Sequence, residues 1–245
     1  MEAKETNFLR FLNRPMQLTI PIYQRTYSWK IKECEQLWKD ILKAGNNEDI
    51  SGHFVGSIVY VEKGIYQVSS LPRLLVIDGQ QRLTTLSLLI SALCSHIKKK
   101  NTKTEINPEK LLSYYLLNSQ EDGEEKYKLV LTQADKTSYF KILENLNFSE
   151  EDSIRIKENY EFFKEQIEKV AQDLLKKLNP KLVIGWRKKQ QAKAAVRVEI
   201  EKQLDDGLPN AYTRKLFLIK CQMIFQHFYD NYYGDGKSVY TLVQH

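Results

Sequence analysis

The sequence predicts an α+β fold, in which a small mixed sheet with flanking helices is followed by a mainly helical C-terminal part. Three observations lead to this expectation. Short apolar runs bounded by turn residues precede Asp78, apolar positions then recur at helical spacing, and amphipathic helical patterns dominate after Asn179-Pro180. A length of 245 residues accommodates one large domain or two modest ones.

The earliest apolar runs predict strands. Residues 17–29 (QLTIPIYQRTYSW) combine β-branched and aromatic residues around one proline, which indicates a short strand that continues into an ordered loop. Residues 30–44 show helical spacing and stop at Gly45. Residues 54–61 (FVGSIVYV) and 74–77 (LLVI) are apolar runs bounded by glycine, proline or charged residues, and both are expected to form buried strands.

The remaining apolar patterns predict helices. Lysines at positions 98–100 come at the end of the predicted helix over residues 83–97, where cations complement the helix dipole. We therefore interpret them first as a helix end and only second as a nucleic-acid site. The long aromatic stripe between residues 154 and 178 is typical of a helix face that packs in a core. The helical patterns cover residues 83–97, 108–118, 133–145, 154–178, 192–204 and 216–233.

The net charge of +6 is unevenly distributed. Residues 1–180 carry a balance of +1, whereas residues 181–245 carry +5. An excess of this size is typical of a solvated helical surface, and contact with nucleic acid stays open as the alternative. No apolar stretch reaches the roughly 20 residues of a membrane span, and the N-terminus lacks the features of a secretory signal. We therefore expect a cytoplasmic protein with no membrane partner.

Several kinds of site are excluded by residue spacing. Cys34, Cys94 and Cys221 are far apart and form no CxxC pair, which predicts neither a disulfide framework nor a zinc ribbon. The four histidines show no spacing that would let them share a metal ion. None of the ten glycines belongs to a GxxxxGK[ST] sequence, so a nucleotide site in this chain cannot be a P-loop.

The densest group of chemically useful residues is the run DGQQRLTT, which begins at Asp78 between a predicted strand and a predicted helix. Such a junction presents unpaired backbone N–H groups and the positive end of the helix dipole to an anion, and Gly79 permits close approach. Arg82 can clamp a phosphate, and Asp78 can hold Mg²⁺ or fix the arginine. Gln80 and Gln81 can orient water or phosphate oxygens. The alternative is a capping Asp78 and a surface Arg82.

Two further runs combine residues with binding chemistry. The run IPIYQRTYSW, which begins at Ile20, holds a rigid proline, a second Gln-Arg pair and three aromatic residues, so it offers stacking for a base and a second cation for phosphates. The run HFVGS places Gly56 where a ligand can approach the backbone, and His53 can carry a proton or donate to a phosphate. Each run also has a purely structural interpretation, packing for the first and a satisfied histidine for the second.

The order IPIYQRTYSW, HFVGSIV and LLVIDGQQRLTTL resembles the N-terminal domain of the GmrSD-like restriction proteins over about residues 5–180. The resemblance implies a ParB/sulfiredoxin-like fold and a nucleoside triphosphatase, using an NTP with Mg²⁺, that gates cleavage of modified phage DNA. It also implies attack by water on the γ-phosphate, with Arg82 and Arg25 stabilising the developing charge. The implied nucleotide-binding residues are Tyr23, Gln24, Arg25, His53, Gly56, Gly79, Gln80, Arg82 and Thr84. The implied catalytic residues are Arg25, Asp78, Gln81 and Arg82, with Asp78 as the metal ligand.

The C-terminal part departs from that family. We find no HNH nuclease motif, so nuclease activity is not expected from this chain alone. The stretches RKKQQAKAAVR and FQHFYDNYYGDGKSVY are similar to the C-terminal helical tail of the R subunit of type I restriction enzymes, which implies docking onto a methyltransferase subunit. Packing of these helices within the chain is the alternative.

These patterns predict three segments and two competing functions. Residues 1–100 are expected to form the nucleotide-binding core, 101–180 a helical extension of it, and 181–245 a basic helical tail. The first function is an NTP-binding and NTP-hydrolysing sensor of a DNA restriction system. The second is a non-catalytic component that uses residues 181–245 to dock on a restriction or methyltransferase subunit or on DNA.

Overall fold

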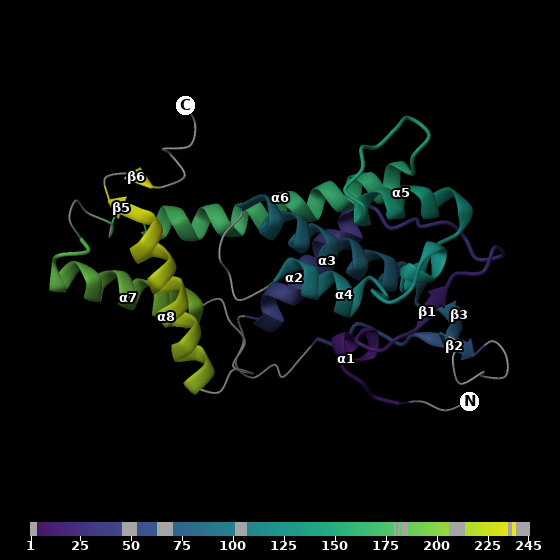
Figure 1. Cartoon of the computed structure of the whole chain (residues 1–245), viewed down its shortest axis with the longest axis horizontal. Coiled ribbons are helices and arrows are strands. Elements are labelled where there is room, and N and C mark those ends of the chain that lie inside the picture. Colours follow the sequence, from purple (N-terminus) through teal and green to yellow (C-terminus); the bar gives the residue numbers. More distant parts are fainter. Residues whose placement is uncertain are drawn as a thin grey trace. The chain divides into compact units, whose positions relative to one another are not determined.

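The chain divides into two compact units in the computed structural model (Figure 1). The first unit combines Met1–Glu35 with Val55–Ile167, and the second combines Gln36–Phe54 with Glu168–His245. Helix α2 (Ile31–Gly45) contributes residues to both units, as does helix α6. The structure describes residues 4–45, 53–62, 71–100, 107–178, 180, 182, 186–205, 214–234 and 237–238.

The first unit contains a four-stranded mixed sheet in the order β2-β3-β1-β4. Strand β1 pairs in parallel with β3 and with β4, and β2 pairs antiparallel with β3. Leu18 of β1 lies opposite Leu74 and Leu129, and all three are buried. The sheet confirms the predicted small mixed sheet with flanking helices. The strands are β1 (Gln17–Thr19), β2 (Val59–Glu62), β3 (Arg73–Asp78) and β4 (Leu129–Val130).

Helix α3 (Gln80–Lys100) is the most deeply buried helix next to this sheet, although it carries several hydroxyl residues. Thr84, Thr85 and Ser91 each donate a side-chain hydrogen bond to the carbonyl group four residues earlier. These bonds satisfy the hydroxyls inside the helix and allow them to be buried. The other helices of the first unit are α1 (Phe8–Leu12), α4 (Pro108–Tyr115), η1 (Gly123–Lys126), α5 (Gln133–Leu143) and the first part of α6 (Ile154–Leu178).

The predicted strand over residues 54–61 is wrong in extent and in burial. The structure has β2 only at Val59–Glu62, and three of its four residues are exposed because β2 is an edge strand. Residues 53–58 are irregular. Gly56 explains the interruption, since its φ of +94° is incompatible with an extended strand.

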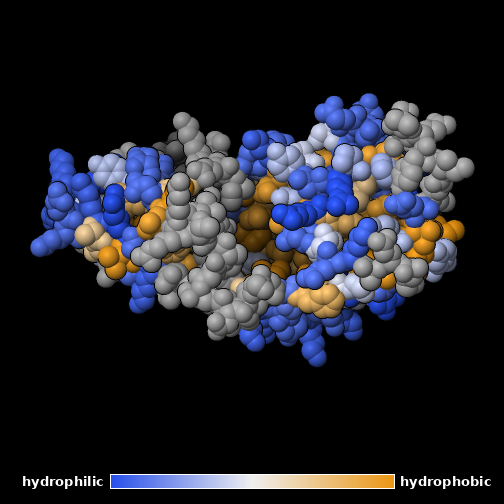
Figure 2. All heavy atoms as spheres, turned by 90° about the horizontal axis from the view of Figure 1, so that it is seen from below, coloured by the Kyte–Doolittle hydropathy of each residue, from blue (hydrophilic) through white to orange (hydrophobic). Residues whose placement is uncertain are grey.

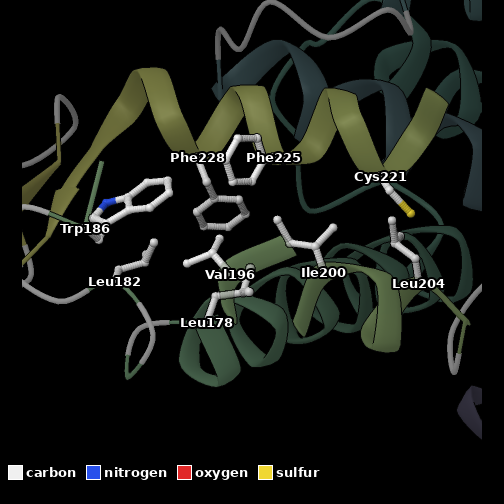
Figure 3. Close-up of a cluster of buried hydrophobic side chains, with 9 residues drawn as sticks. All are labelled: Leu178, Leu182, Trp186, Val196, Ile200, Leu204, Cys221, Phe225 and Phe228. Atoms are coloured by element: carbon white, nitrogen blue, oxygen red, sulfur yellow. The ribbon is translucent and has the colours of Figure 1, made fainter. Parts of the chain in front are cut away.

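The second unit is mainly helical, which confirms the expectation for the C-terminal part. Helices α7 (Gln190–Asp205) and α8 (Arg214–Asn231) pack with the end of α6 and precede a short hairpin, β5 (Tyr232–Gly234) and β6 (Lys237–Ser238). Trp186 is completely buried, and its Nε1 donates a hydrogen bond of 3.0 Å to the Tyr232 carbonyl. Figure 3 shows the core, which contains Leu178, Leu182, Trp186, Val196, Ile200, Leu204, Cys221, Phe225 and Phe228.

None of the helices in the described ranges combines the length and the apolar run that crossing a membrane requires. The three cysteines are reduced and buried. Burial raises the pKa of the Cys34 thiol to about 12 and that of Cys94 to about 11, so neither is a reactive thiolate near neutral pH.

Candidate functional site

The junction between β3 and α3 in the first unit is built around Gly79. Its φ is +96°, and an added Cβ would lie 3.0 Å from the Ser57 carbonyl oxygen and 3.2 Å from Ile58 Cα. Only glycine fits this backbone without strain. The Leu83 amide donates to the Gly79 carbonyl at 3.0 Å, so the amides of the helical residues before Leu83 have no acceptor inside the helix. The junction thus has the backbone features of an anion site.

Arg82 is held next to this junction by two neighbours. Its Nη2 donates to Asp78 Oδ2 at 3.1 Å, with the Arg82 side chain 27% exposed and that of Asp78 64% exposed. On another side the guanidinium lies against Gly56, where an added Cβ would be 2.0 Å from Nη1. A guanidinium has five N–H donors, so Arg82 keeps donors for a ligand while its position is fixed. The structure therefore brings Gly56, Asp78 and Arg82 together.

A pair of glutamines joins the loop after β1 to the same junction. Gln24 Nε2 donates to the Ile77 carbonyl at 2.9 Å, at the end of β3. Its Oε1 accepts from Gln80 Nε2 at 3.3 Å. Gln80 is buried, and this contact fixes the orientation of both amides. The two Gln-Arg motifs recognised in the sequence are thus adjacent in space.

Gln81 anchors the following part of this loop. Its Oε1 accepts from the backbone amides of Ser28 at 2.9 Å and Trp29 at 3.3 Å, and its Nε2 donates to the Thr26 carbonyl at 3.2 Å. The side chain is buried. These bonds occupy the amide group of Gln81, which was expected from the sequence to orient water or phosphate oxygens. In the structure, Gln81 holds the loop segment that follows Arg25.

A buried network of hydrogen bonds at Tyr27, in the loop after β1, was not predicted from the sequence. Asn159 Nδ2 donates to the Tyr27 hydroxyl at 2.8 Å. The Thr85 hydroxyl donates its hydrogen to the Gln81 carbonyl. The Tyr27 hydroxyl is therefore the donor in its 2.7 Å hydrogen bond with Thr85 Oγ1. Asp135 accepts from the Tyr27 amide at 2.6 Å. Burial raises the pKa of Tyr27, which stays a neutral hydrogen-bonding group.

The tip of the loop is open to solvent. A hydrogen bond of 3.0 Å from the Gln24 amide to the Pro21 carbonyl closes a turn, and Tyr23 in that turn is 71% exposed. Arg25 is also exposed. Both side chains are accessible to a ligand. Thr84, in contrast, is buried, and its hydroxyl donates to the Gln80 carbonyl, so it faces the helix interior.

His53 has a different neighbour from the other candidates. Its Nε2 lies 3.8 Å from Asp40 Oδ2, and its side chain is 37% exposed. Both residues belong to the second unit, whereas the other candidate residues belong to the first. The two carry opposite charges only when the histidine is protonated.

The described part of the chain holds no cluster of three or more His, Cys, Asp or Glu side chains that could bind a metal ion without other ligands. Asp78 is the carboxylate of the junction. Mg²⁺ in nucleotide sites is commonly bound by one or two carboxylates together with substrate phosphates and water. The donor set at the junction fits this mode.

The whole site falls in a region that matches a known family. A model of the family described as GmrSD restriction endonuclease, N-terminal domain, matches residues 8–231. The chain belongs to this family. The match confirms the resemblance carried by the three motifs, and it continues past residue 180 to include α7 and α8. The protein is therefore a module related to restriction systems. A comparison with curated proteins finds no match.

Proposed function

We propose that the β3–α3 junction binds the phosphates of an NTP together with Mg²⁺, and that the GmrSD-family chain is the nucleotide-binding and nucleotide-hydrolysing sensor of a DNA restriction system. The observation that carries the proposal is the placement of Arg82. Its guanidinium is fixed by Asp78 and Gly56 beside a helix N-terminus whose first amides lack intrahelical acceptors. Backbone amides and a bidentate cation together favour a phosphate group.

The surrounding residues have distinct roles in this proposal. Asp78 supplies the carboxylate for Mg²⁺, which when bound neutralises phosphate charge and orients the phosphates. The exposed Arg25 is the second cation, and the exposed ring of Tyr23 offers a stacking surface for the base. Gln24 and Gln80 keep this loop next to the junction through their amide pair.

Hydrolysis requires stabilisation of charge on the transferred phosphoryl group and orientation of water. Arg82 and Arg25 are assigned to the charge. Gln80 Nε2 donates a hydrogen bond to Gln24, and we propose that the side-chain oxygen of Gln80, Oε1, accepts a hydrogen bond from the attacking water. Gln81 is assigned a positioning role, because its amide is bonded to the loop that carries Arg25.

The proposal is tested by measuring binding of four labelled NTPs to the full chain with Mg²⁺. Arg82→Ala is expected to weaken binding by about 10- to 100-fold, the magnitude of a lost charge-assisted contact of about 1.5–3 kcal/mol. Arg155→Ala is the matched control, since Arg155 is an arginine of the same unit that pairs with Glu158 on α6. Hydrolysis is then followed with and without modified DNA. Absence of binding, or equal binding by Arg82→Ala and wild type, would reject the nucleotide site.

A second function is favoured by exposed apolar side chains on the C-terminal helices. Val198 is 62% exposed, Leu218 50% and Ile219 43%. Such residues suit a protein–protein contact, in line with a non-catalytic component that docks on a restriction or methyltransferase subunit. Under this alternative, Val198→Ser with Leu218→Ser abolishes co-purification with such a subunit, and no NTP is turned over. Nucleotide turnover by the isolated chain would argue against it.

A further inference from the structure

The start of α7 carries a concentration of positive charge. Residues 186–198 contain two arginines and three lysines and no aspartate or glutamate. In the ranges that the structure describes, the ion pairs involve none of Lys188, Lys189, Lys193 and Arg197. Elsewhere the chain pairs many of its exposed cations, for example Lys126 with Glu144. We call Lys188, Lys189, Lys193 and Arg197 the basic strip.

Aromatic rings of α8 lie against two cations of the strip, Lys193 and Arg197, and against the neighbouring Arg187. Arg197 lies 4.3 Å from the centroid of the Phe225 ring. Arg187 and Lys193 lie 5.4 Å and 5.9 Å from the centroid of the Tyr229 ring. A cation over a ring face is attracted by the ring quadrupole, and its motion is restricted. The rings of α8 therefore restrict the side chains of Lys193 and Arg197.

The rings themselves are fixed by the core of the second unit. Trp186 is buried and contacts Phe225 and Tyr229 edge to face, with centroid distances of 5.9 Å and 5.8 Å. The turn after Trp186 is closed by a hydrogen bond of 3.2 Å from the Lys189 amide to the Trp186 carbonyl. The strip thus follows shortly after Trp186, a residue anchored in the core and labelled in Figure 3.

The spacing of the cations favours a regular polyanion. Lys189, which directly precedes α7, Lys193 and Arg197 follow one another at intervals of four residues, so they lie along one side of the helix from its start. Like charges at this spacing destabilise a helix on their own. Four helical residues rise by about 6 Å, close to the roughly 7 Å that two phosphate steps span along one strand of duplex DNA. The scattered carboxylates of an acidic protein would not match this interval in the same way.

We propose that the basic strip binds the phosphate backbone of duplex DNA without reading its sequence. Figure 2 shows hydrophilic side chains gathered at the left end of the view, where Figure 1 places the start of α7. Phosphate contacts of this kind fix the position and register of a protein on DNA. The strip belongs to the second unit, so this inference does not depend on nucleotide binding at the β3–α3 junction.

The test measures the affinity of the full chain for a short fluorescent duplex over a series of salt concentrations. The triple variant Lys189→Gln, Lys193→Gln, Arg197→Gln removes three phosphate contacts. The slope of log K against log salt is expected to become shallower by about 2.7, from about 0.9 per contact. A charge-matched control, Lys157→Gln, Lys164→Gln, Lys176→Gln on α6, is expected to keep the wild-type slope. Thermal melts establish that each variant is folded.

A further variant separates ordering from charge. Tyr229→Leu removes the ring under Arg187 and Lys193 and leaves every charge in place, so affinity is expected to fall about 3- to 10-fold while the salt slope is unchanged. An unchanged slope in the triple variant would overturn the proposal, as would a wild-type protein that does not bind the duplex. Equal affinity for polyglutamate and for the duplex would also overturn it and would indicate an acidic protein partner.

Discussion

At the scale of single residues, the position of Arg82 depends on the absence of a side chain at Gly56. The guanidinium occupies the space that a Cβ at position 56 would take. The backbone there, at φ +94°, is also one that residues other than glycine rarely adopt. The sequence predicts that Gly56 lies next to a ligand. In the structure its immediate neighbour is the arginine that we assign to that ligand.

Gly56→Ala is therefore expected to displace the Arg82 guanidinium and to weaken NTP binding about as much as Arg82→Ala does. Stability should fall by about 1–3 kcal/mol because of the strained backbone. A double-mutant cycle checks the mechanism. In the Arg82→Ala background the alanine no longer meets a guanidinium, so Gly56→Ala should have little further effect on binding. Additive losses in binding would contradict a shared mechanism.

Lys128 is a second residue whose role is visible only in the structure. Its side chain is buried, and Nζ donates to the carbonyls of Leu12, Arg14 and Tyr114 at 2.6, 2.9 and 2.8 Å. Leu12 and Tyr114 lie in the last turns of α1 and α4, where carbonyl groups lack helical partners. One ammonium group thus completes the ends of two helices. Burial lowers the pKa of Lys128 to about 8.

Lys128→Met is expected to destabilise the protein by about 1–3 kcal/mol, because it leaves buried carbonyls without a donor. The size of the loss should depend on pH. Between pH 8 and the ordinary lysine pKa of 10.5, the unfolded chain binds more protons at this position than the folded chain. The contribution of Lys128 to stability therefore rises with pH over this range. Denaturant unfolding of both proteins at pH 7.5, 9 and 10 checks the prediction, using roughly the window set by these two values. A difference independent of pH would contradict it.

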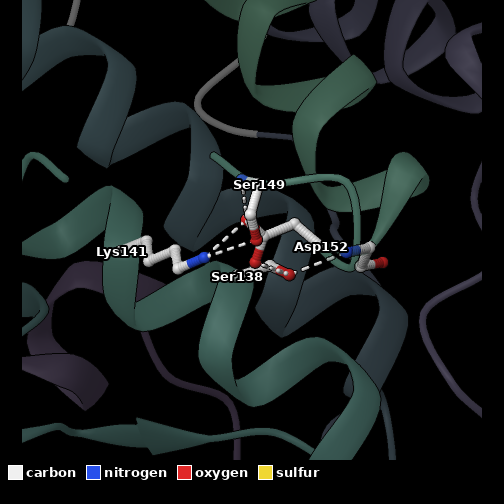
Figure 4. Close-up of polar contacts among 5 residues, drawn as sticks. Ser138, Lys141, Ser149 and Asp152 are labelled. Atoms are coloured by element: carbon white, nitrogen blue, oxygen red, sulfur yellow. Dashed lines mark hydrogen bonds and ion pairs between the residues drawn. The ribbon is translucent and has the colours of Figure 1, made fainter. Parts of the chain in front are cut away.

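At the scale of elements, a buried carboxylate joins α5 to the start of α6 (Figure 4). Asp152 Oδ2 accepts from Lys141 Nζ at 2.7 Å and from the Ser149 hydroxyl at 3.0 Å, and Oδ1 accepts from the Ser138 hydroxyl at 3.0 Å. Burial alone would raise the pKa of Asp152. The bonds from Lys141, Ser149 and Ser138 outweigh it, and the pKa lies well below its usual range.

Asp152→Asn is expected to destabilise the protein at neutral pH by about 1–3 kcal/mol, since the lysine loses its charged partner. Because the folded-state pKa is depressed, the contribution is complete above the ordinary aspartate pKa of 3.8 and is lost as the pH falls below it. The stability difference between the two proteins should therefore narrow in acid. Asp122→Asn is the control, because Asp122 is exposed and makes no capping bond. A similar loss in both variants would exclude a specific role for Asp152.

Helices and strands that show a pattern in their own residues could be predicted from the sequence. Features that depend on contacts between residues far apart in the sequence could not. The helices from α2 to α8 follow apolar spacing that the sequence displays directly, and the small mixed sheet follows from short apolar runs. The strand over 54–61 failed because Gly56 has a positive φ and lies against Arg82, a neighbour 26 residues later that no local pattern indicates. Asn159 and Asp135 hold the loop through bonds that span more than 100 residues, and no local pattern marks them.

At the scale of the whole molecule, the two units are discontinuous in sequence. The second unit includes Gln36–Phe54 as well as residues from Glu168 onward. A change in composition near residue 180 marks where basic residues accumulate, but it carries no information about a segment more than 100 residues earlier. The motifs were sufficient to recognise the family and to select the residues that meet at the β3–α3 junction. The basic strip needed the structure, because its ordering depends on rings of α8.

The two proposed sites belong to different units, and a sensor requires that they communicate. If DNA on the basic strip gates nucleotide use, saturating duplex should change NTP affinity, and saturating NTP should change DNA affinity by the same factor, because coupling is reciprocal. A factor of about 5 to 150 is typical of such coupling. Arg82→Ala should remove the NTP effect and keep the salt slope for DNA, whereas the triple variant of α7 should do the reverse. Titration of each ligand with and without the other measures the factor. Two independent affinities, each unchanged by the second ligand, would show that the chain binds both ligands without acting as a sensor.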